Sequence, residues 1–510
     1  MLMSDIIIGI DLGTTNSCGA YVNEEGNVKL VPTPGGGTTI PSIFAIDDKG
    51  NELLGFEAKR QWLLNPTKTV YGAKRLMGRN PSGGFVSKMK EYFPYEINSS
   101  ESGKVVISIG DREMNLVEIS SCILNKVRTL AADHLGQPVT QAVVTVPAYF
   151  NDRQRQAVKE AGKMVNLEVT RVVNEPTAAA MAYGLRKDVN QTVAIYDLGG
   201  GTFDVSVIEI RGKVFEVKAT GGDIFLGGID WDNALIDYVL RDFETKNGVD
   251  LSKDPIAMQR IKDLAERTKV DLSSRTEAPF SIPFISMTPE GTPLDINLVI
   301  SRQLYENLTQ PLVDRTIEIA EMVVQDSGLT VQDLDAVLLV GGQTRWPAVQ
   351  EAVQEFFGQE PSKGVHPDEA VAAGAAIYGH SLQSEATDEK MQLLDVIPMR
   401  IGIERADGTL QEIFERNAAV PNQKSMNFTT SYDNQAELAM RIYQGDAQTA
   451  LKNEMLGEFE FSGIRQGPEG AVNVQVVFDC SVDGILTLSA HDADTGNEMT
   501  TTIKVASSEQ

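Results

Sequence analysis

The chain has 510 residues, with 45 Lys and Arg against 71 Asp and Glu, which gives a formal net charge of −26. Hydrophobic residues make up 42% of it, enough for sizeable cores and too many for a disordered chain. Because a surface this acidic repels phosphate backbones and anionic lipid, we expect neither nucleic acid nor membrane among its partners. The length is typical of about three domains.

Three cysteines, Cys18, Cys122 and Cys480, lie far apart and form no C-x-x-C pair. This spacing argues against a disulfide scaffold and favours a reducing compartment. The first apolar stretch, residues 6–10, is too short for a signal peptide or a membrane span. We therefore expect a cytoplasmic protein.

Up to about residue 379, β-branched strand patterns alternate with long helical patterns. Residues 142–146 are typical of a buried strand, and residues 152–165 are typical of a helix. This alternation predicts an α/β layer fold.

From residue 396 onward, short alternating strands replace the helices. Leu438, Met440 and Ile442 alternate with other residues along one such strand, which predicts one buried face. Turn signals separate the strands at Asp407-Gly408, Asp433-Asn434 and Asp483-Gly484. The pattern predicts an antiparallel β-sandwich.

Between these regions, residues 381–395 begin acidic and end in Met391-Gln392-Leu393-Leu394-Asp395. Solvated linkers avoid exposed leucines, so the apolar end needs an explanation. One hypothesis makes it the first strand of the sandwich. The other makes it a segment that docks on the preceding domain in one state.

The chain also contains an internal repeat. Residues 6–22 and residues 193–210 each consist of an apolar strand, an Asp-Leu-Gly loop and a second apolar strand. Two related halves that face each other would bring both loops to one cleft.

Both loops have the composition of phosphate sites. Gly13, Thr14, Thr15 and Asn16 offer backbone N–H groups and hydroxyls at a tight turn, and residues 199–202 (Gly-Gly-Gly-Thr) offer the same with a backbone that a ligand can approach closely. Taken together they predict a phosphate clamp. Neither a P-loop nor a strand-linked G-x-G-x-x-G motif is found, which disfavours P-loop and Rossmann folds.

Carboxylates accompany these loops. Asp11, Asp197 and Asp204 lie beside them, and Glu175 follows in Val-Asn-Glu-Pro-Thr. Carboxylates repel a polyphosphate unless a cation intervenes, so we expect Mg²⁺, held partly through its waters. Lys74 is the best candidate cation for the γ-phosphate or the attacking water, although on the residues alone an ordinary surface lysine is the default interpretation.

Several longer motifs closely resemble the DnaK branch of the seventy-kilodalton heat-shock chaperones. The stretches that carry the resemblance are residues 10–17, 146–152, 174–179, 197–204, 340–342, 367–372 and 483–486. It covers nearly the whole chain. The resemblance implies an actin-like, two-lobed ATPase domain over residues 1–382, a linker over residues 383–395 and a peptide-binding β-sandwich over residues 396–506.

By matched motif, the resemblance assigns the nucleotide site. Residues 13–16 with Gly200, Gly201 and Thr202 would hold phosphates, and the three aspartates would organise Mg²⁺, with K⁺ as a further candidate. Lys74, Glu175, Asp197 and Thr202 would carry out ATP hydrolysis. The adenosine would be held by Glu266, Lys269, Ser273, Gly342 and Arg345.

The resemblance also implies interdomain and partner sites. Interdomain signalling would use Pro147, Arg155, Leu393, Leu394 and Asp395. A J-domain cochaperone would meet Arg171, Asn174 and Asp395, and a nucleotide-exchange factor would grip residues 250–272. Extended apolar peptides would enter a pocket formed by Ile401, Ile403, Phe428, Leu438 and Met440, for which ordinary sandwich core is the alternative.

Some positions depart from the family pattern. Gln392 interrupts a linker that is otherwise aliphatic, which predicts weaker docking, and the chain stops at residues 507–510, where a helical lid would begin. The expected function is therefore an ATP-driven chaperone of the stress response without a lid. A nucleotide-gated regulatory or exchange-factor-like protein is the first alternative, and an actin-fold small-molecule kinase the second. Cys18 is a candidate redox sensor, against the simpler interpretation of a small buried residue.

Overall fold

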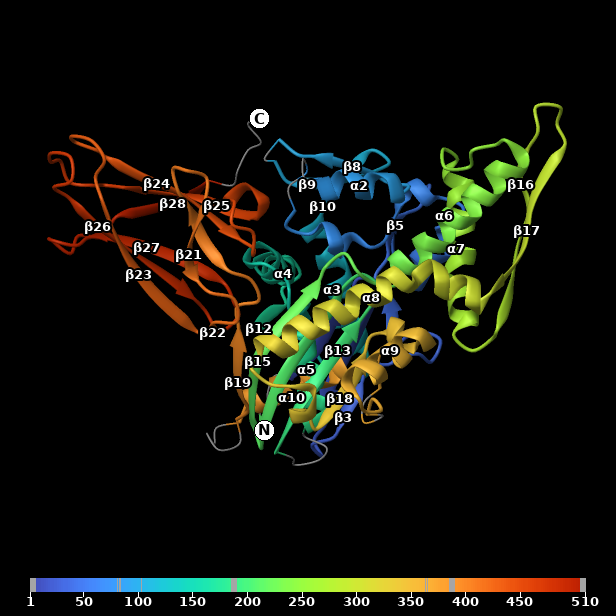
Figure 1. Cartoon of the computed structure of the whole chain (residues 1–510), viewed down its shortest axis with the longest axis horizontal. Coiled ribbons are helices and arrows are strands. Elements are labelled where there is room, and N and C mark those ends of the chain that lie inside the picture. Colours follow the sequence, from blue (N-terminus) through green and yellow to red (C-terminus); the bar gives the residue numbers. More distant parts are fainter. Residues whose placement is uncertain are drawn as a thin grey trace.

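The computed structural model describes residues 6–79, 81, 84–101, 103–184, 190–362, 364, 366–384 and 390–504. Two six-stranded sheets form its centre, and a β-sandwich lies to one side of them (Figure 1). Part of the expected linker, residues 385–389, and the expected lid boundary after residue 504 lie outside the described residues.

The first central sheet has the strand order β12-β11-β1-β2-β3, and β4 pairs with β2. Strands β1, β11 and β12 are parallel, whereas β2 runs antiparallel to β1. Helices α3 and α4 share one hydrophobic core with this sheet. The elements are β1 (Ile7–Leu12), β2 (Asn16–Val22), β3 (Val28–Leu30), β4 (Thr39–Pro41), β11 (Gln141–Val146), β12 (Glu168–Asn174), α3 (Leu116–Leu135) and α4 (Asp152–Met164).

The second central sheet has the order β18-β13-β14-β15-β19-β22. Its hairpin β13–β14 repeats the hairpin β1–β2, and in each case a parallel strand lies beside the first strand of the hairpin. The internal repeat predicted from sequence is therefore present. The strands are β13 (Asn190–Leu198), β14 (Phe203–Arg211), β15 (Val214–Asp223), β18 (Ala336–Val340), β19 (Gln392–Val396) and β22 (Ala419–Val420).

Helices α5 (Glu175–Gly184) and α10 (Ala370–Leu382) join the two sheets, because both contribute to one core with strands of each sheet. The two helices touch at Gly374, where an added Cβ would collide with the carbonyl of Ala178. Only glycine allows this approach, and the small residues of α5 and α10 thereby fix the relation of the two halves.

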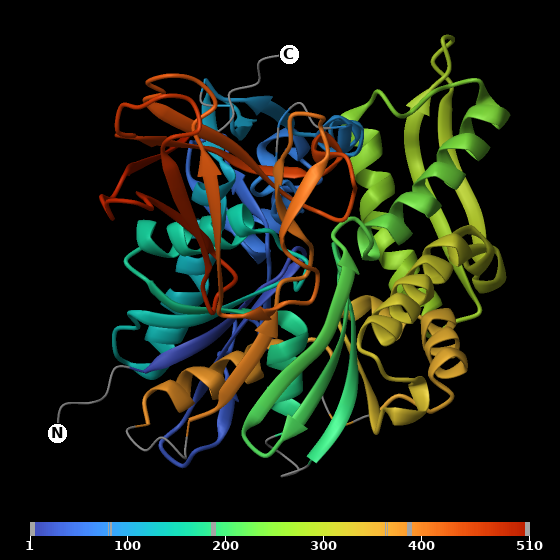
Figure 2. The ribbon, with the colours of Figure 1, turned by 60° about the vertical axis from the view of Figure 1, so that its left-hand side comes forward.

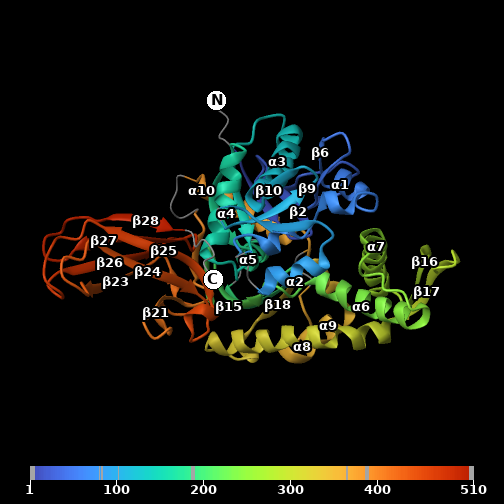
Figure 3. The same cartoon turned by 90° about the horizontal axis from the view of Figure 1, so that it is seen from above.

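Smaller elements extend each half. Near the first sheet they are α1 (Phe56–Gln61), α2 (Gly84–Tyr92), η1 (Pro66–Lys68), η2 (Ala73–Leu76), β5 (Phe44–Ile46), β6 (Glu52–Leu54), β7 (Thr69–Val70), β8 (Glu96–Ser99), β9 (Val105–Ile109) and β10 (Arg112–Asn115). Near the second they are α6 (Gly228–Asn247), α7 (Pro255–Leu272), α8 (Arg302–Asp326), α9 (Pro347–Phe357), η3 (Val331–Asp333), η4 (Gly342–Arg345), β16 (Glu277–Met287) and β17 (Pro293–Ser301). Helices α1 and α7 face each other from the two halves (Figure 3). None of the helices in the described ranges is long and apolar enough to cross a membrane.

The sandwich consists of a five-stranded sheet, β21-β20-β24-β25-β28, and a three-stranded sheet, β23-β26-β27. The predicted alternation in β24 holds as far as Ile442, where a bulge shifts the register and leaves Tyr443 buried as well. The elements are β20 (Ile401–Glu404), β21 (Leu410–Phe414), β23 (Asn422–Thr429), β24 (Glu437–Gln444), β25 (Glu454–Ser462), β26 (Asn473–Cys480), β27 (Leu486–Asp492), β28 (Thr500–Lys504) and η5 (Ala450–Lys452).

The apolar end of the linker forms β19, which has features of both hypotheses about it. Its first part pairs in parallel with β15, and its last two residues pair with β22 at the entrance to the sandwich. Leu393 packs into the core between the central sheets, whereas Gln392 and Leu394 are exposed. Gln392 therefore does not interrupt the buried face of the linker, and the expectation of weaker docking on its account stays a prediction.

Candidate functional site

The two predicted phosphate loops lie against each other. A Cβ added at Gly200 would collide with the side chain of Thr15, and one at Gly201 would collide with Thr14. The loops line a cavity of about 190 Å³ together with the side chains expected at the site, namely Asp11, Asn16, Lys74, Glu175, Asp197 and Thr202. The structure thus brings together residues that lie up to about two hundred positions apart in the chain.

Lys74 and Glu175 form the central ion pair of this cavity. The Lys74 Nζ lies 2.8 Å from the Glu175 Oε1, and both side chains are about nine-tenths buried. Lys74 comes from η2, and Glu175 is the first residue of α5. A buried pair of this kind is held in place by the two elements, so the ammonium stays directed at the cavity.

Asp11 and Asp197 line this cavity, whereas Asp204, paired with Asp197 on the next strand, lies behind the lining; together they carry more negative charge than Lys74 balances. Burial raises the pKa of Asp11 to about 7 and that of Asp204 to about 8, with a further contribution from the charge of Glu175 in each case. Burial and the charge of Glu175 also raise the pKa of Asp197 well above its ordinary value. A bound cation would remove this penalty.

The fit of a metal ion follows from two further observations. The Asp204 Oδ1 accepts from the Tyr149 N–H at 3.1 Å, whereas its buried Oδ2 has no hydrogen-bond partner among the residues that the structure describes. In the described part of the chain, no three His, Cys, Asp or Glu side chains are close enough to hold a metal ion directly. These residues suit a Mg²⁺ ion that keeps most of its water ligands, and they do not suit a closed protein cage.

A second cavity, of about 320 Å³, adjoins the first and shares Thr14, Thr15, Gly200 and Gly342 with it. Of the predicted adenosine residues, Glu266, Lys269, Gly342 and Arg345 line it. Ser273 does not: it caps α7, and its hydroxyl donates to the Lys269 carbonyl at 3.2 Å.

Arg75 is a site residue to which sequence reasoning gave no role. Its side chain is fully buried, its Nε donates to the Gly201 carbonyl at 2.8 Å, and its guanidinium pairs with Asp230 at 2.5 Å. It thereby ties η2 of the first half to the phosphate loop of the second. The sequence feature that could have identified Arg75 is its position directly after Lys74.

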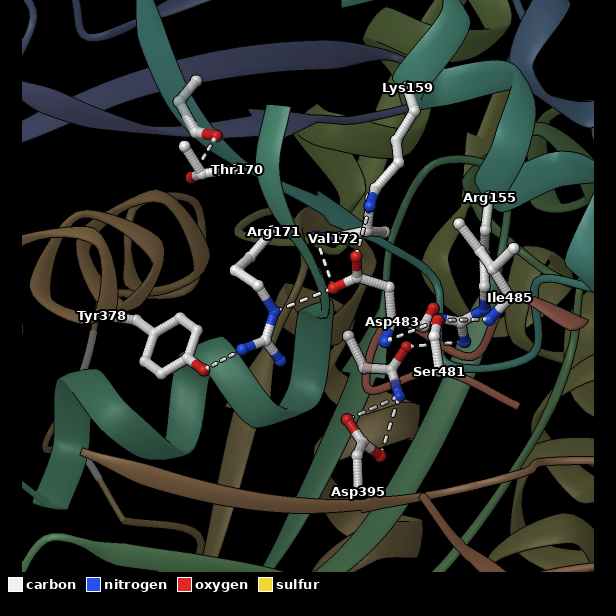
Figure 4. A network of polar contacts seen from close by, with 12 residues as sticks. Arg155, Lys159, Thr170, Arg171, Val172, Tyr378, Asp395, Ser481, Asp483 and Ile485 are labelled. Atoms are coloured by element: carbon white, nitrogen blue, oxygen red, sulfur yellow. Dashed lines mark hydrogen bonds and ion pairs between the residues drawn. The ribbon is translucent and has the colours of Figure 1, made fainter. Parts of the chain in front are cut away.

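A second group of polar residues joins the sandwich to the central sheets (Figure 4). Asp483, in the turn before β27, accepts from the Arg171 Nε at 2.8 Å and also pairs with Lys159. The Arg171 guanidinium donates in addition to the Tyr378 hydroxyl at 2.7 Å. The sequence analysis used Asp483 as a turn signal and as part of the stretch 483–486 that carries the resemblance, but gave it no role between the domains, so its charge was the overlooked signal.

Arg155 lies at the centre of this junction and is buried. It donates to the Asn174 Oδ1 at 2.8 Å, and it reaches the Asp483 carbonyl at 3.4 Å. Asn174 in turn donates to both carboxylate oxygens of Asp395 at 3.0 Å, which fixes the end of the linker. Helix α4 positions Arg155 through its N-terminal capping box, in which Asn151 and Gln154 bond each other.

The remaining predicted residues have the following surroundings. Pro147 is buried directly after β11. Ile401, Ile403 and Met440 belong to the buried core of the sandwich, and Phe428 and Leu438 are partly buried against it. Cys18 lines the smaller cavity but is 1% exposed, and burial raises its pKa, which favours the interpretation as a packing residue.

Residues 7–510 of the chain match the family model described as Hsp70 protein. The match spans both central sheets, the linker and the sandwich.

Proposed function

The chain belongs to the Hsp70 family, and on this premise we propose that it is an ATP-dependent chaperone of the DnaK type in which ATP hydrolysis controls the affinity of the sandwich for extended apolar peptides. Members of this family are chaperones and ATPases that bind ATP or ADP with Mg²⁺, and they combine an actin-like domain with a β-sandwich.

We assign the nucleotide to the two adjoining cavities. The loops at Gly13 and Gly200 would bind phosphates through backbone N–H groups, and Glu266 and Lys269 would bind the adenosine. A Mg²⁺ ion bound through water near Asp204 would supply charge stabilisation to the phosphates. K⁺ remains a further candidate for the same acidic pocket.

In the proposed hydrolysis, Lys74 stabilises the negative charge that develops on the transferred phosphoryl group. Glu175 holds Lys74 in this orientation, and Asp197 and Thr202 position the attacking water. A well-directed donor of this kind contributes about 10²–10³ in rate.

The observation that carries the proposed coupling is the linker strand β19, which pairs with β15 in the sheet that contains a phosphate loop and leads directly into the sandwich. Strand β14 begins directly after that loop and pairs with β15. A change at the loop therefore has a short route through hydrogen-bonded strands to the linker. The bonds of Asp483 to Arg171 and Lys159 hold the sandwich in the same position.

We further propose the family's partners. A J-domain cochaperone would bind near Arg171, Asn174 and Asp395, whose side chains are already engaged in the junction, so its binding would be sensitive to docking. A nucleotide-exchange factor would bind residues 250–272 of the lobe that α7 and the β16–β17 hairpin form. A cytoplasmic location belongs to this proposal as well.

The test follows a labelled, leucine-rich extended peptide by fluorescence anisotropy after addition of Mg²⁺ with ADP or ATP. We expect ATP to accelerate peptide release from the natural chain and to do so far less in Asp483→Asn. Asp494→Asn, which alters an exposed ion pair of the same sandwich with Arg465, is the matched control and should behave as the natural chain.

Two outcomes would overturn the proposal. Release that is indifferent to nucleotide in the natural chain would contradict the coupling. Absence of peptide binding in both nucleotide states would favour the regulatory alternative.

A further inference from the structure

Arg79 lies where the two central halves and the sandwich meet. It comes shortly after η2 and belongs to the first half. Its Nη1 lies 3.0 Å from the Oε2 of Glu454, the first residue of the sandwich strand β25. Its guanidinium also lies over the ring of Phe225, between β15 and α6 in the second half, at 5.0 Å from the ring centroid. One side chain thus contacts three parts of the molecule.

The ion pair of Arg79 and Glu454 is largely shielded from solvent, since the two side chains are 11% and 24% exposed. Burial lowers the pKa of Arg79, and the charge of Glu454 raises it in partial compensation. An exposed ion pair contributes little to stability, whereas removing one partner of a buried pair leaves the other charge uncompensated. Separation of the sandwich would therefore take this carboxylate away from a guanidinium that lies largely out of water.

The segment that carries Arg79 also forms part of the smaller cavity. Lys74, which lines that cavity, belongs to η2 a few positions earlier. Between the two, Gly78 has a φ of 67°, and a Cβ added there would lie 2.9 Å from the side chain of Gln154 in α4. The Gln154 Nε2 donates to the Met77 carbonyl at 3.1 Å. These contacts fix the end of the segment, so the position of Arg79 follows that of η2.

The Phe225 ring is held close to the second phosphate loop. It shortly precedes Gly227, where an added Cβ would lie 2.6 Å from the backbone N of Gly201. The Phe225 N–H donates to the Asp223 Oδ1 at 2.9 Å, which holds the turn after β15. A movement of this phosphate loop is therefore expected to move the ring on which the Arg79 guanidinium lies.

We propose that Arg79 is a positioning residue that makes docking of the sandwich depend on the arrangement of the two halves. In the arrangement that the structure shows, the Phe225 ring holds the planar guanidinium in the orientation that Glu454 requires. When the halves move apart, this orientation is lost, and the ion pair to the sandwich weakens. The inference rests on the proposed function in that nucleotide is what moves the halves. By linkage, a docked sandwich then favours the nucleotide state that holds the halves in this arrangement.

Hydrogen exchange at the Leu486 amide measures docking, because this N–H donates across the junction to the Asp152 Oδ1 at 2.7 Å. It is followed by mass spectrometry on overlapping peptides of the full chain, with and without ATP and Mg²⁺. We expect Arg79→Ala and Glu454→Gln to accelerate the exchange about 10-fold, in line with the loss of a hydrogen bond between charged groups. Phe225→Leu, which keeps an apolar side chain but removes the ring, should accelerate it about 3-fold.

An exchange of charges distinguishes a specific pair from a general loss of packing. Arg79→Glu and Glu454→Arg should each accelerate the exchange, and the double variant should exchange more slowly than either of them. Arg79→Lys keeps the charge but not the planar group, so its exchange rate should lie between those of the natural chain and Arg79→Ala. Arg112→Ala, which breaks an exposed ion pair with Glu52 in the same half, is the matched control and should change nothing.

Thermal unfolding shows whether each variant is folded, and Glu454→Gln provides the test if Arg79→Ala is not. Three results would overturn the inference. They are a Leu486 amide that exchanges freely in every state of the natural chain, unchanged exchange in Glu454→Gln, or unchanged exchange in Phe225→Leu, which would show that docking is insensitive to the second half.

The exchange experiment measures neither peptide release nor hydrolysis, so the two proposals can fail separately. If ATP does not accelerate peptide release from the natural chain, the proposed function is contradicted and the exchange rates of the variants still decide the role of Arg79. If ATP accelerates release while the variants exchange as the natural chain does, only the role of Arg79 is contradicted.

Discussion

Two clusters of buried acidic residues, one in the cleft and one at the junction with the sandwich, are built differently. In the cleft, Asp11 and Asp197 line the smaller cavity with Lys74, whose ammonium is already bound to Glu175. At the junction between the central sheets and the sandwich, Asp483 is bonded to two cations of its own. Figure 2 shows the sandwich against the central part of the chain, with the linker strand between them.

The two clusters differ in the cations available to them: the aspartates of the cleft need a cation from outside, whereas Asp483 at the junction has two within the chain. The pKa values of Asp11 and Asp204 are raised because burial and the charge of Glu175 outweigh the attraction of Lys74, so a cation from outside would stabilise their ionised forms. At the junction Asp483 has cations within the chain, and Asp395, whose pKa burial also raises, is held by hydrogen bonds from Asn174. Opening the junction would break those bonds, whereas filling the cleft would relieve a penalty.

The largest effect that we expect follows from removing Lys74, the cation that lines the smaller cavity. Lys74→Ala should lower the rate of ATP hydrolysis by about 10²–10³, because the developing charge on the phosphoryl group loses its donor. Single-turnover hydrolysis measures this change. Lys68→Ala, which removes a partly exposed lysine paired with Asp48, is the control. Unimpaired hydrolysis in Lys74→Ala would contradict the assignment.

The second prediction concerns pH and the unliganded chain. Because the pKa of Asp204 is raised to about 8 from an ordinary 3.8, folding favours its protonated form, and stability is lost as the pH rises between these values. Without nucleotide and Mg²⁺, Tm should fall from pH 6 to pH 8 more steeply in the natural chain than in Asp204→Asn. Calorimetric unfolding at several pH values measures both slopes. Parallel slopes would show that Asp204 bears no such penalty.

The third prediction sharpens the comparison at the junction. Leu393→Ser removes an apolar side chain from the core between the sheets and should weaken docking by about 1–2 kcal/mol, or roughly 10-fold in the acceleration of peptide release by ATP. Leu394→Ser is the matched control, since Leu394 is 44% exposed. Equal effects of the two would mean that another face of the linker docks.

The smallest effect is expected at the neighbouring position. Gln392→Leu should change the ATP acceleration of peptide release less than about 2-fold, because the side chain is exposed and its backbone alone pairs with the other domain. The same anisotropy assay measures it. A large gain would indicate a docked conformation in which this side chain is buried.

The cleft was predictable to a large extent because its loops are local. A hairpin turn with Gly and Thr residues offers phosphate donors whatever lies around it, so residues 13–16 and 199–202 could be found from spacing alone. The repeat then implied that the loops meet, and they do. The hydroxyl bond of Ser273 to the Lys269 carbonyl could not be predicted, because a motif does not show whether a residue at a helix end bonds to its own helix; its assignment to the adenosine stays a prediction.

The junction was predictable only in part. Arg155 and Asp395 were expected there from resemblance, but Asp483 was not, because its partner Arg171 lies 312 positions earlier in the chain. The Asp483-Gly484 pattern predicts a backbone turn, but it does not predict which residues the Asp483 carboxylate contacts. The same holds for Arg75, whose bond to Gly201 spans 126 positions.

By itself, the sequence determined the strands, helices and turns, the repeat, and the chemical nature of each loop, since these depend on residues close together in the chain. Only the tertiary structure decided which charges are paired. It left Asp204 and Gln259 with unbonded atoms, gave Asp483 two cations and exposed Gln392. Burial and pairing depend on contacts between distant segments, and the balance between desolvation and a partner's charge is set only when those segments pack.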